Sequence, residues 1–404
     1  MKIFVQIIKS RLLVYCMLVW VFTSMISCRK EITKTNAASS YTGSNFSDVF
    51  ESFWNGMNNN YVFWDIDTTN WDNVYSTYKP LFSKLNLYNS NDILKSVDYF
   101  NAMTSGLVDS HYTLTFYDVA DSSGNYYQIS PAANRKYNKW GYLKNIPSSL
   151  FDSIIPLKYL DKSSIHAGTD SVVLGSSYEQ MFVISGTINN KILYLHFNMF
   201  ALQQAGTNVQ PVLNYFFNTV ANLPSSINGI IIDVRQNGGG EITDLNFLLG
   251  RMTTSQYTFG YTRSKNGNGR LDYTPWAPAM VTPQSGAANI TKPIVMLADG
   301  NSASMAEITT MAIKSLNNGK FVGDTTWGAT GPLAPNVYYN GGQFDAGNFV
   351  NVYTSSTMLK YKDGKIYEGK GFPPDYEINY TTQVAGVKSG TDPQLEKAIS
   401  VIGN

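Results

Sequence analysis

Cysteine and charge are both scarce in this chain of 404 residues. The only cysteines are Cys16 and Cys28, so the chain beyond position 28 has neither an internal disulfide nor a thiolate metal site. Charged residues make up 15% of the chain, against about 25% in typical soluble domains. The formal net charge is +1 and no basic run stands out, which argues against electrostatic binding of nucleic acid.

Hydrophobic residues, in contrast, are plentiful at 43%, and aromatic residues reach 14%. Intrinsic disorder requires low hydrophobicity and high net charge, so this composition argues against a disordered chain. At roughly 150 residues per domain, the length predicts two or three domains, or one large domain with additions.

The first residues have the pattern of an export signal. A positively charged flank precedes an apolar run from 12 to 22, which is shorter than the roughly 20 residues of a membrane-spanning helix. Ser27-Cys28 then resembles the end of the bacterial lipobox, in which a small residue precedes a cysteine that becomes lipidated. We expect a lipoprotein signal peptide over 1–27, lipidation at Cys28 and a flexible tether over 28–44.

This prediction places the protein in the bacterial cell envelope, as an outer-membrane lipoprotein that faces the periplasm or the cell surface. The lipid would be its only contact with the membrane. An ordinary signal peptide with an incidental Cys28 is the alternative.

Three blocks follow the tether. Residues 45–111 place apolar side chains at helical spacing, which predicts a helical N-terminal subdomain, and residues 112–190 read as a β-rich intermediate segment. Residues 191–404 alternate strands with helices, and Ile230–Val234 and Ile294–Ala298 are continuous apolar strands. Apolar strands between helices predict an α/β fold with a largely parallel sheet covered on both faces.

One chemical signal lies at the end of the strand over Ile230–Val234. Residues 233–240 read Asp-Val-Arg-Gln-Asn-Gly-Gly-Gly, and we call them the glycine loop. Glycines at a helix start can present backbone N–H groups to an anion. The loop lacks the spacing of a phosphate or dinucleotide loop, so an oxyanion hole or a plain tight turn remain as its interpretations.

A second signal follows the strand over Ile294–Ala298. Residues 299–307 read Asp-Gly-Asn-Ser-Ala-Ser-Met-Ala-Glu and open a helix; we call them the serine loop. A serine at such a turn can expose its hydroxyl as a nucleophile next to the following backbone N–H. The alternative is that Ser302 or Ser304 only caps the helix, a position that serine favours.

The two loops together resemble the C-terminal-processing (tail-specific) protease and tricorn family of serine peptidases. That family has Asp-Leu-Arg-x-Asn-x-Gly-Gly, then Ser-Ala-Ser-x-x-Glu, Val-Gly-x-x-Thr-x-Gly, Gly-x-x-Pro-Asp and a terminal Asp-Pro-Gln-Leu-Glu-Lys-Ala helix. The corresponding segments here are Asp233–Gly240, Ser302–Glu307, Val322–Gly328, Gly371–Asp375 and Asp392–Ala398. The resemblance extends over roughly 45–400 and is strong after 190.

The resemblance implies a crotonase/ClpP-like catalytic core in which Ser304, aligned on Glu307, is the nucleophile. It implies that the backbone N–H groups of Gly239 and Met305 form the oxyanion hole, and that Glu307 is structural. In the processing-protease branch a lysine is the general base, but the matching position here is Ala329. The sequence therefore resembles the branch without the catalytic lysine and needs another base.

The favoured base is His111. Asp109–Thr113 reads Asp-Ser-His-Tyr-Thr and resembles the Asp-x-His-Thr segment of the tricorn branch, whose Ser-His pair is retained as Ser110 and His111. By the same resemblance Ser110 contacts or orients the base and Glu368 completes a tetrad. A serine hydroxyl needs a base within hydrogen-bond reach, and an imidazole can take and return its proton.

The competing candidates are less suited to this role. His196 lies inside an apolar strand, which favours a structural role, and His166 follows a loop. Lys360 and Lys370 could replace the missing lysine, but a catalytic lysine must be desolvated and this region reads as exposed. Asp363-Gly364 predicts a hairpin between Met358–Tyr361 and Lys365–Glu368, which would place Glu368 on a strand.

These expectations predict an exported, lipid-anchored serine endopeptidase that cleaves peptides or unfolded protein tails through an acyl-enzyme. No metal and no organic cofactor is implied. Residues 117–185 show no carboxylate-binding loop of a PDZ module, so we favour an unrelated β insertion there. The alternatives are a decayed peptide- or ligand-binding lipoprotein of the same fold and, less favoured, an acyl enzyme acting on coenzyme A thioesters.

Overall fold

A computed structural model describes residues 43–140, 154–175, 177–267, 269–333 and 342–403. The predicted signal peptide, the lipidation site Cys28 and most of the predicted tether lie outside the described residues. Among the helices described, none combines the length and the apolar character that spanning a bilayer demands.

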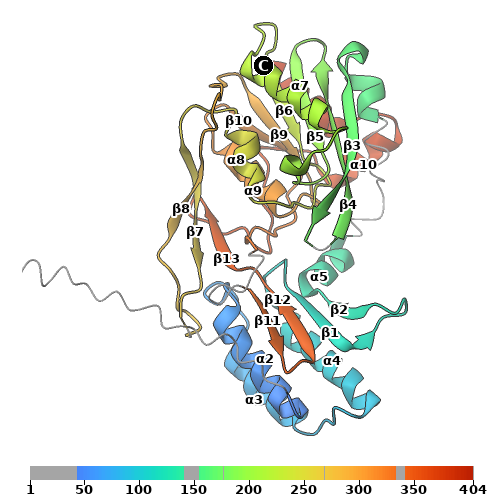
Figure 1. The fold of residues 1–404 in the computed structure, drawn as a ribbon, viewed down its shortest axis with the longest axis vertical. Helices are drawn as coiled ribbons and strands as arrows, with labels where there is room; N and C mark the ends of the chain where they lie inside the picture. The colour runs from blue at the N-terminus through green and yellow to red at the C-terminus, as the bar shows by residue number, and fades with distance from the viewer. Residues whose placement is uncertain (1–42, 141–153, 176, 268, 334–341, 404) are drawn as a thin grey trace, which may run out of the picture.

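A seven-stranded sheet forms the larger part of the molecule (Figure 1). Its order is β14 (Tyr376–Glu377), β10 (Gly319–Gly323), β9 (Ile294–Ala298), β6 (Gly229–Asp233), β5 (Ile192–Phe197), β4 (Ser177–Ile188) and β3 (His166–Leu174). Strands β14 to β5 run parallel, and β4 and β3 are antiparallel. The predicted α/β fold with a largely parallel sheet is therefore confirmed. We call this sheet and its helices the seven-stranded body.

Helices cover both faces of this sheet. Alternate side chains of its apolar central strands point to opposite sides, so each face has apolar side chains that pack against helices. Ile230 and Ile232 of β6 pack into one cluster and Ile231 packs into another, and all three are fully buried. The first cluster lies under α7 (Gln210–Ala221), α8 (Asp244–Leu249) and α9 (Met305–Lys314). The second includes side chains of α11 (Pro393–Gly403), which follows α10 (Tyr380–Lys388). Figure 1 shows these two helices behind the sheet.

The N-terminal helices form a second body with a core of aromatic rings. Its helices are α2 (Phe46–Asn60), α3 (Trp71–Phe82) and α4 (Ser90–Thr104). They pack on a four-stranded sheet in the order β11 (Gln343–Ala346), β12 (Val350–Tyr353), β1 (Thr113–Ala120) and β2 (Tyr126–Ile129). Phe100, for example, contacts the rings of Phe53, Phe116 and Phe349. We call this unit the N-terminal body.

This second body is not continuous in sequence. Strands β11 and β12 come from the region expected to lie in the 191–404 core, yet they pair with β1 and contribute Phe344, Phe349 and Val352 to the aromatic cluster. In the antiparallel register Thr113 lies opposite Tyr353. Residues just before β1 therefore meet residues just after β12, and that register brings His111 to Ser355.

The expected hairpin around Asp363-Gly364 is only partly present. The tight turn forms, with Gly364 at φ 84° and the Tyr361 amide donating to the Lys365 carbonyl over 2.9 Å. However, β13 (Thr357–Tyr361) pairs with β7 (Tyr257–Ser264), which pairs with β8 (Ala277–Val281), and residues 365–368 form no strand. The prediction that Glu368 lies on a strand is wrong, because its carboxylate accepts hydrogen bonds in the interior and turns the chain inward.

A shorter helix connects the two bodies. α5 (Pro131–Trp140) follows β2 and lies between the N-terminal body and the seven-stranded body (Figure 1). His166, expected after a loop, is the first residue of β3, and its ring stacks on Tyr215 of α7 with the ring centroids 3.9 Å apart. The stacking accounts for His166 without a catalytic role.

Candidate active site

Ser304 begins helix α9 in a strained backbone conformation. Its φ of 54° and ψ of −117° are rarely adopted by residues other than glycine. The surrounding hydrogen bonds hold it there: the Ser304 amide donates to Glu307 Oε2 over 3.2 Å, and the Ala303 amide donates to the Asn237 carbonyl over 3.0 Å. A strained serine at a strand-to-helix turn matches the geometry of a nucleophile elbow.

Ser302, the other serine considered, has a different environment. It is fully buried, its hydroxyl donates to the Val234 carbonyl over 2.7 Å, and it accepts from the Asp299 amide over 2.9 Å. The Ser302 hydroxyl therefore ties the serine loop to the end of β6 and is not available to a substrate.

The glycine loop packs directly against Ser304. A Cβ atom placed on Gly239 would lie 2.6 Å from Ser304 Cβ and 2.9 Å from the Met305 backbone nitrogen, and the φ of Gly239 is +100°. Only glycine fits this contact and this conformation. The two loops singled out from the sequence thus meet at Ser304.

The expected pair of oxyanion donors is only partly in place. Met305 is the first residue of α9, so its amide has no carbonyl partner within the helix and lies beside Ser304. The Gly239 amide, in contrast, donates to Asn237 Oδ1 over 2.8 Å. Asn237 is buried and its own amide group donates to the Phe197 carbonyl over 2.9 Å, which holds that side chain in place. In this structure the Gly239 amide is therefore occupied within its own loop.

His111 is oriented by a buried carboxylate and a hydroxyl. Asp109 Oδ1 accepts from the His111 amide and from Ser355 Oγ, each over 2.9 Å. Ser355 Oγ also lies 3.4 Å from His111 Nδ1. Because the Ser355 hydroxyl proton goes to Asp109, the same oxygen can accept the Nδ1 proton, which leaves Nε2 of His111 with a free lone pair.

The electrostatic environment of His111 favours the neutral ring. Burial lowers the pKa of His111, and the nearby Asp109 carboxylate opposes that effect. A neutral imidazole with an accepting Nε2 is the form that a general base requires. Ser355 was not predicted from the sequence, since only the register of β1 with β12 brings it to His111.

Glu368 connects the His111 segment to the serine loop region. Its Oε1 accepts from the Ser110 amide over 2.7 Å, and Oε2 accepts from the Thr330 and Gly331 amides over 2.7 and 2.8 Å. Burial and then the Asp109 charge raise the pKa of Glu368, while the amides of Ser110 and Gly331 oppose the rise. The Ser110 hydroxyl is buried and has no hydrogen-bond partner among the described residues.

Glu307 plays the same connecting role from the side of the nucleophile. Its Oε1 accepts from Thr326 Oγ1 over 2.5 Å and from the Gly328 amide over 2.7 Å, and Oε2 accepts from the Ala329 amide over 2.7 Å. Ala329, where the processing branch has lysine, is buried and offers only this amide.

Residues 326–331, which we call the bridging segment, thus lie between two carboxylates. Glu307 binds its first half and the Ser304 amide, and Glu368 binds its second half and the Ser110 amide. Hydrogen bonds of Glu307 and Glu368 therefore tie the Ser304 and Ser110 amides to one short backbone segment, whose two halves are joined covalently between Ala329 and Thr330. The sequence-predicted Ser304, Ser110, His111 and Glu368 belong to one network.

The alternative bases lie elsewhere. Lys370 is exposed, and Lys360 of β13 places Nζ 4.1 Å from the ring centroid of Trp276, away from the bridging segment. His196 is buried in β5, and its Nδ1 lies 3.1 Å from the Asp233 carbonyl oxygen. Each of these groups has a structural environment.

Ligand atoms of Asp109, His111 and Glu368 lie within 4.8 Å of one another, which raises the question of a metal site. Asp109 Oδ2 already accepts from Thr354 Oγ1 and from the Ser355 amide over 2.5 and 2.7 Å, in addition to the two bonds to Oδ1. Glu368 is similarly surrounded by N–H donors. Carboxylates satisfied by donors do not fit a cation, so we assign this cluster to positioning His111.

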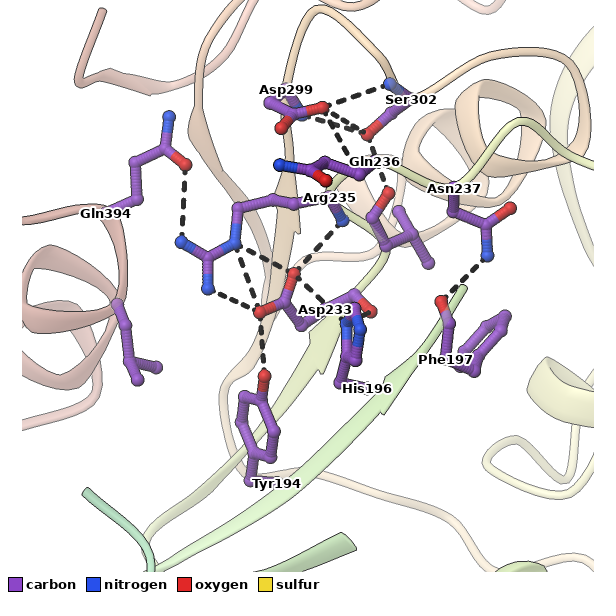
Figure 2. A network of polar contacts seen from close by, with 12 residues as sticks. Tyr194, His196, Phe197, Asp233, Arg235, Gln236, Asn237, Asp299, Ser302 and Gln394 are labelled. Atoms are coloured by element: carbon purple, nitrogen blue, oxygen red, sulfur yellow. Dashed lines mark hydrogen bonds and ion pairs between the residues drawn. The ribbon is translucent and has the colours of Figure 1, made fainter. Parts of the chain in front are cut away.

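A buried ion-pair network supports the glycine loop from below (Figure 2). Arg235 is 1% exposed; its guanidinium donates to Asp233 over 2.6 Å and to Asp392, which directly precedes α11, over 2.7 Å. Burial raises the pKa of Asp233, but Arg235 and His196 outweigh it and hold that pKa below its usual range. Tyr194 also donates to Asp233, over 2.7 Å. The network fixes the chain at the point where β6 ends and the glycine loop begins.

Comparison with known proteins agrees with this geometry. Residues 191–378 match the family described as peptidase family S41. The tricorn protease of Thermoplasma volcanium is 26% identical over 191 residues, or 47% of this chain and 16% of that protein. The nisin-resistance protein of Lactococcus lactis is 24% identical over 163 residues, or 38% of this chain and 48% of that protein. The chain thus spans less than half the length of these relatives.

Two solved structures share the fold over most of the chain. A structure from Parabacteroides merdae has a TM-score of 0.65 at 21% identity and covers 89% of this chain and 97% of its own. The mature form of CPAF has a TM-score of 0.57 at 12% identity and covers 89% and 96%. At this level of identity they support the fold alone.

The resemblance predicted from the five sequence motifs is confirmed: residues 191–378, a little under half of the chain, match peptidase family S41, a family of serine-type peptidases. The matched range contains the glycine loop, the serine loop, the bridging segment and Glu368. His111 and Ser110 lie outside it, in the N-terminal body.

Proposed function

We propose that this protein is a serine endopeptidase in which Ser304 is the nucleophile and His111 is the general base. The observation that carries the proposal is the strained Ser304 at the start of α9, in contact with Gly239 and with the Met305 amide. The hydrogen bonds through Glu307, the bridging segment and Glu368 support the assignment of His111, because they tie its segment to that of the nucleophile.

The proposed reaction follows from the chemistry of these groups. Nε2 of His111 takes the proton from Ser304 Oγ as this oxygen attacks the peptide carbonyl, and the Met305 amide stabilises the resulting oxyanion. His111 then returns the proton to the leaving amine, which gives an acyl-enzyme on Ser304 that water hydrolyses. Asp109, Ser355 and Glu368 act as positioning residues that hold the ring and its tautomer.

The oxyanion site gains its second donor if substrate binding releases the Gly239 amide from Asn237. This release requires the Asn237 side chain to rotate away from the Gly239 amide and to give up its hydrogen bond to the Phe197 carbonyl. We further infer a crotonase/ClpP-like core, because the parallel strands carry the nucleophile at a strand-to-helix turn.

The substrate and location are part of the same proposal. An apolar segment followed by Cys28 favours export and lipid anchoring in the cell envelope. Peptides or unfolded protein tails are the substrates that we propose, since an extended backbone can add to an exposed strand edge.

A fluorophosphonate probe tests the nucleophile. We expect the probe to label the wild-type protein on Ser304, and the Ser304→Ala variant to lose both labelling and peptide cleavage. Ser315→Ala, which removes a partly buried hydroxyl at the other end of α9, is the matched control and should retain both. Cleavage that persists unchanged in Ser304→Ala would show that the nucleophile is a different residue.

The second candidate function is a peptide-binding protein with a decayed site. Two observations favour this function. The Gly239 amide, an expected oxyanion donor, is occupied by Asn237, and buried Ala329 stands where the processing-protease branch has its lysine base. This function predicts peptide binding without probe labelling in the wild-type protein, so the same experiment separates the two candidates.

A further inference from the structure

Lys136 of α5 lies beside the bridging segment. Its Nζ is 4.4 Å from the ring centroid of Trp327, the residue that precedes Gly328 and Ala329. The amides of those two residues bind Glu307, which also holds the Ser304 amide. Helix α5 lies between the two bodies (Figure 1). Through Lys136 it brings a primary amine to the bridging segment, which is tied to Ser304 by Glu307.

This amine has no anionic partner in direct contact. Among the residues that the structure describes, Lys136 Nζ forms no ion pair and no hydrogen bond. Glu307 and Glu368 attract its charge, but N–H and O–H donors of the protein already occupy the oxygens of both carboxylates. The face of Trp327 attracts a cation yet accepts no conventional hydrogen bond.

We propose that Lys136 binds a carboxylate of the peptide substrate close to the scissile bond, and so determines specificity for acidic substrates. An ammonium group has three donors, and a half-buried ammonium without an acceptor is incomplete until an anion arrives. The carboxylate can be an acidic side chain or the free end of a peptide. This inference rests on the proposed function, because it places the substrate at Ser304.

The environment of Lys136 gives this specificity a pH limit. Burial, and to a smaller extent the charge of neighbouring Arg135, lower the pKa of Lys136 to about 8 against the opposing charges of Glu307 of α9 and Glu368. The ammonium form therefore declines as the pH rises through about 8, and the preference for a carboxylate should decline with it.

The experiment uses three peptides of one length: one with Glu near the scissile bond and an amidated end, one with Gln in that place, and one with Gln and a free carboxyl end. We measure kcat and KM between pH 6.5 and 9.5 for wild type, Lys136→Met and Lys136→Arg. We expect wild type to show a KM about tenfold lower for a carboxylate peptide than for the neutral peptide, as one charge-assisted contact allows. Which carboxylate peptide shows the effect identifies its source.

The variants separate binding from other roles. Lys136→Met should lose the preference at every pH, with the change in KM rather than kcat, and Lys136→Arg should keep it above pH 8, because a guanidinium stays charged. Lys397→Met is the matched control, since Lys397 of α11 also lies over an aromatic ring, 4.8 Å from the Tyr376 centroid. It should retain the wild-type preference.

Two outcomes would overturn the inference. One is a wild-type enzyme that cleaves all three peptides with equal KM, and the other is a Lys136→Met variant that loses kcat and probe labelling, which would make the amine a base. The affinities of Ser304→Ala for the three peptides, measured by fluorescence anisotropy, test the same preference without turnover. A failure of the proposed peptidase function is seen separately, as absent probe labelling of the wild-type protein.

Discussion

The backbone amide of Ser110 donates a hydrogen bond to Glu368 Oε1 over 2.7 Å, although 258 positions separate the two residues in sequence. Ser110 belongs to the N-terminal body, and Glu368 follows β13, which pairs with β7 in the three-stranded sheet β13-β7-β8. The bond sets the position of the segment that carries His111. His111 is therefore positioned by a residue within the range that matches peptidase family S41, although His111 itself lies outside that range.

Replacing Glu368 with Gln should disturb this position. The carboxylate accepts from three backbone amides and a hydroxyl, whereas a carboxamide has only one oxygen and turns N–H groups toward one set of these donors. We expect stability to fall by about 1–3 kcal/mol in thermal or denaturant unfolding, with at least a tenfold loss of kcat. Glu377→Gln, at an exposed carboxylate of β14, is the control, and an equal effect there would contradict the assignment.

The pH dependence of cleavage should report the lowered pKa of His111. Because burial favours the neutral ring, kcat/KM for the neutral peptide should stay level below the ordinary histidine pKa of about 6.5 and fall only at more acidic pH. His111→Ala should lose about 10²–10⁴-fold in kcat together with this acidic limb. A limb that remains at the same pH in His111→Ala would assign the titration to another group.

Gly239→Ala should inactivate the enzyme by displacing Ser304. The added Cβ would lie 2.6 Å from Ser304 Cβ, and the φ of +100° adds strain. We expect loss of probe labelling and a destabilisation of about 1–3 kcal/mol in denaturant unfolding. Gly390→Ala is the matched control, because Gly390 has φ +78° and no atom within 4 Å of the added Cβ. The Gly390→Ala variant should retain probe labelling. Loss of labelling in this control would mean that backbone strain alone explains the effect of Gly239→Ala.

Arg235→Met should be strongly destabilising. The substitution leaves Asp233 and Asp392 buried without their cation, a situation that typically costs about 3–5 kcal/mol of unfolding free energy. The control Arg270→Met breaks a partly exposed pair with Asp72 and should cost at most about 1 kcal/mol. The free energy of unfolding of both variants is measured with urea. Equal losses would show that burial of the Arg235 network adds nothing to its contribution to stability.

The central strands and the two loops that follow them could be predicted from the sequence, because their signals are local. The apolar run over β9 and the Ser-Ala-Ser segment after it lie within a few residues of each other, as do β6 and the glycine loop. Continuous apolar runs between turn residues identify buried strands without knowledge of their partners.

The surroundings of the base could not be predicted in the same way. Ser355 reaches His111 only through the register of β1 with β12, and Lys136 reaches the bridging segment only because α5 lies between the two bodies. The prediction that Glu368 lies on a strand was wrong because it rested on the Asp363-Gly364 turn, which is a local signal. The hydrogen bonds that hold Glu368 in the interior come from distant amides. Long-range contacts of single polar residues leave no periodic pattern.

The ion pair of Arg235 with Asp392 has a consequence for biosynthesis. While the ribosome is still making α10, the guanidinium has only one of its two carboxylate partners, and the glycine loop above it lacks its anchor. The ion-pair network below the glycine loop can therefore be complete only after the chain has been synthesised through Asp392, close to α11.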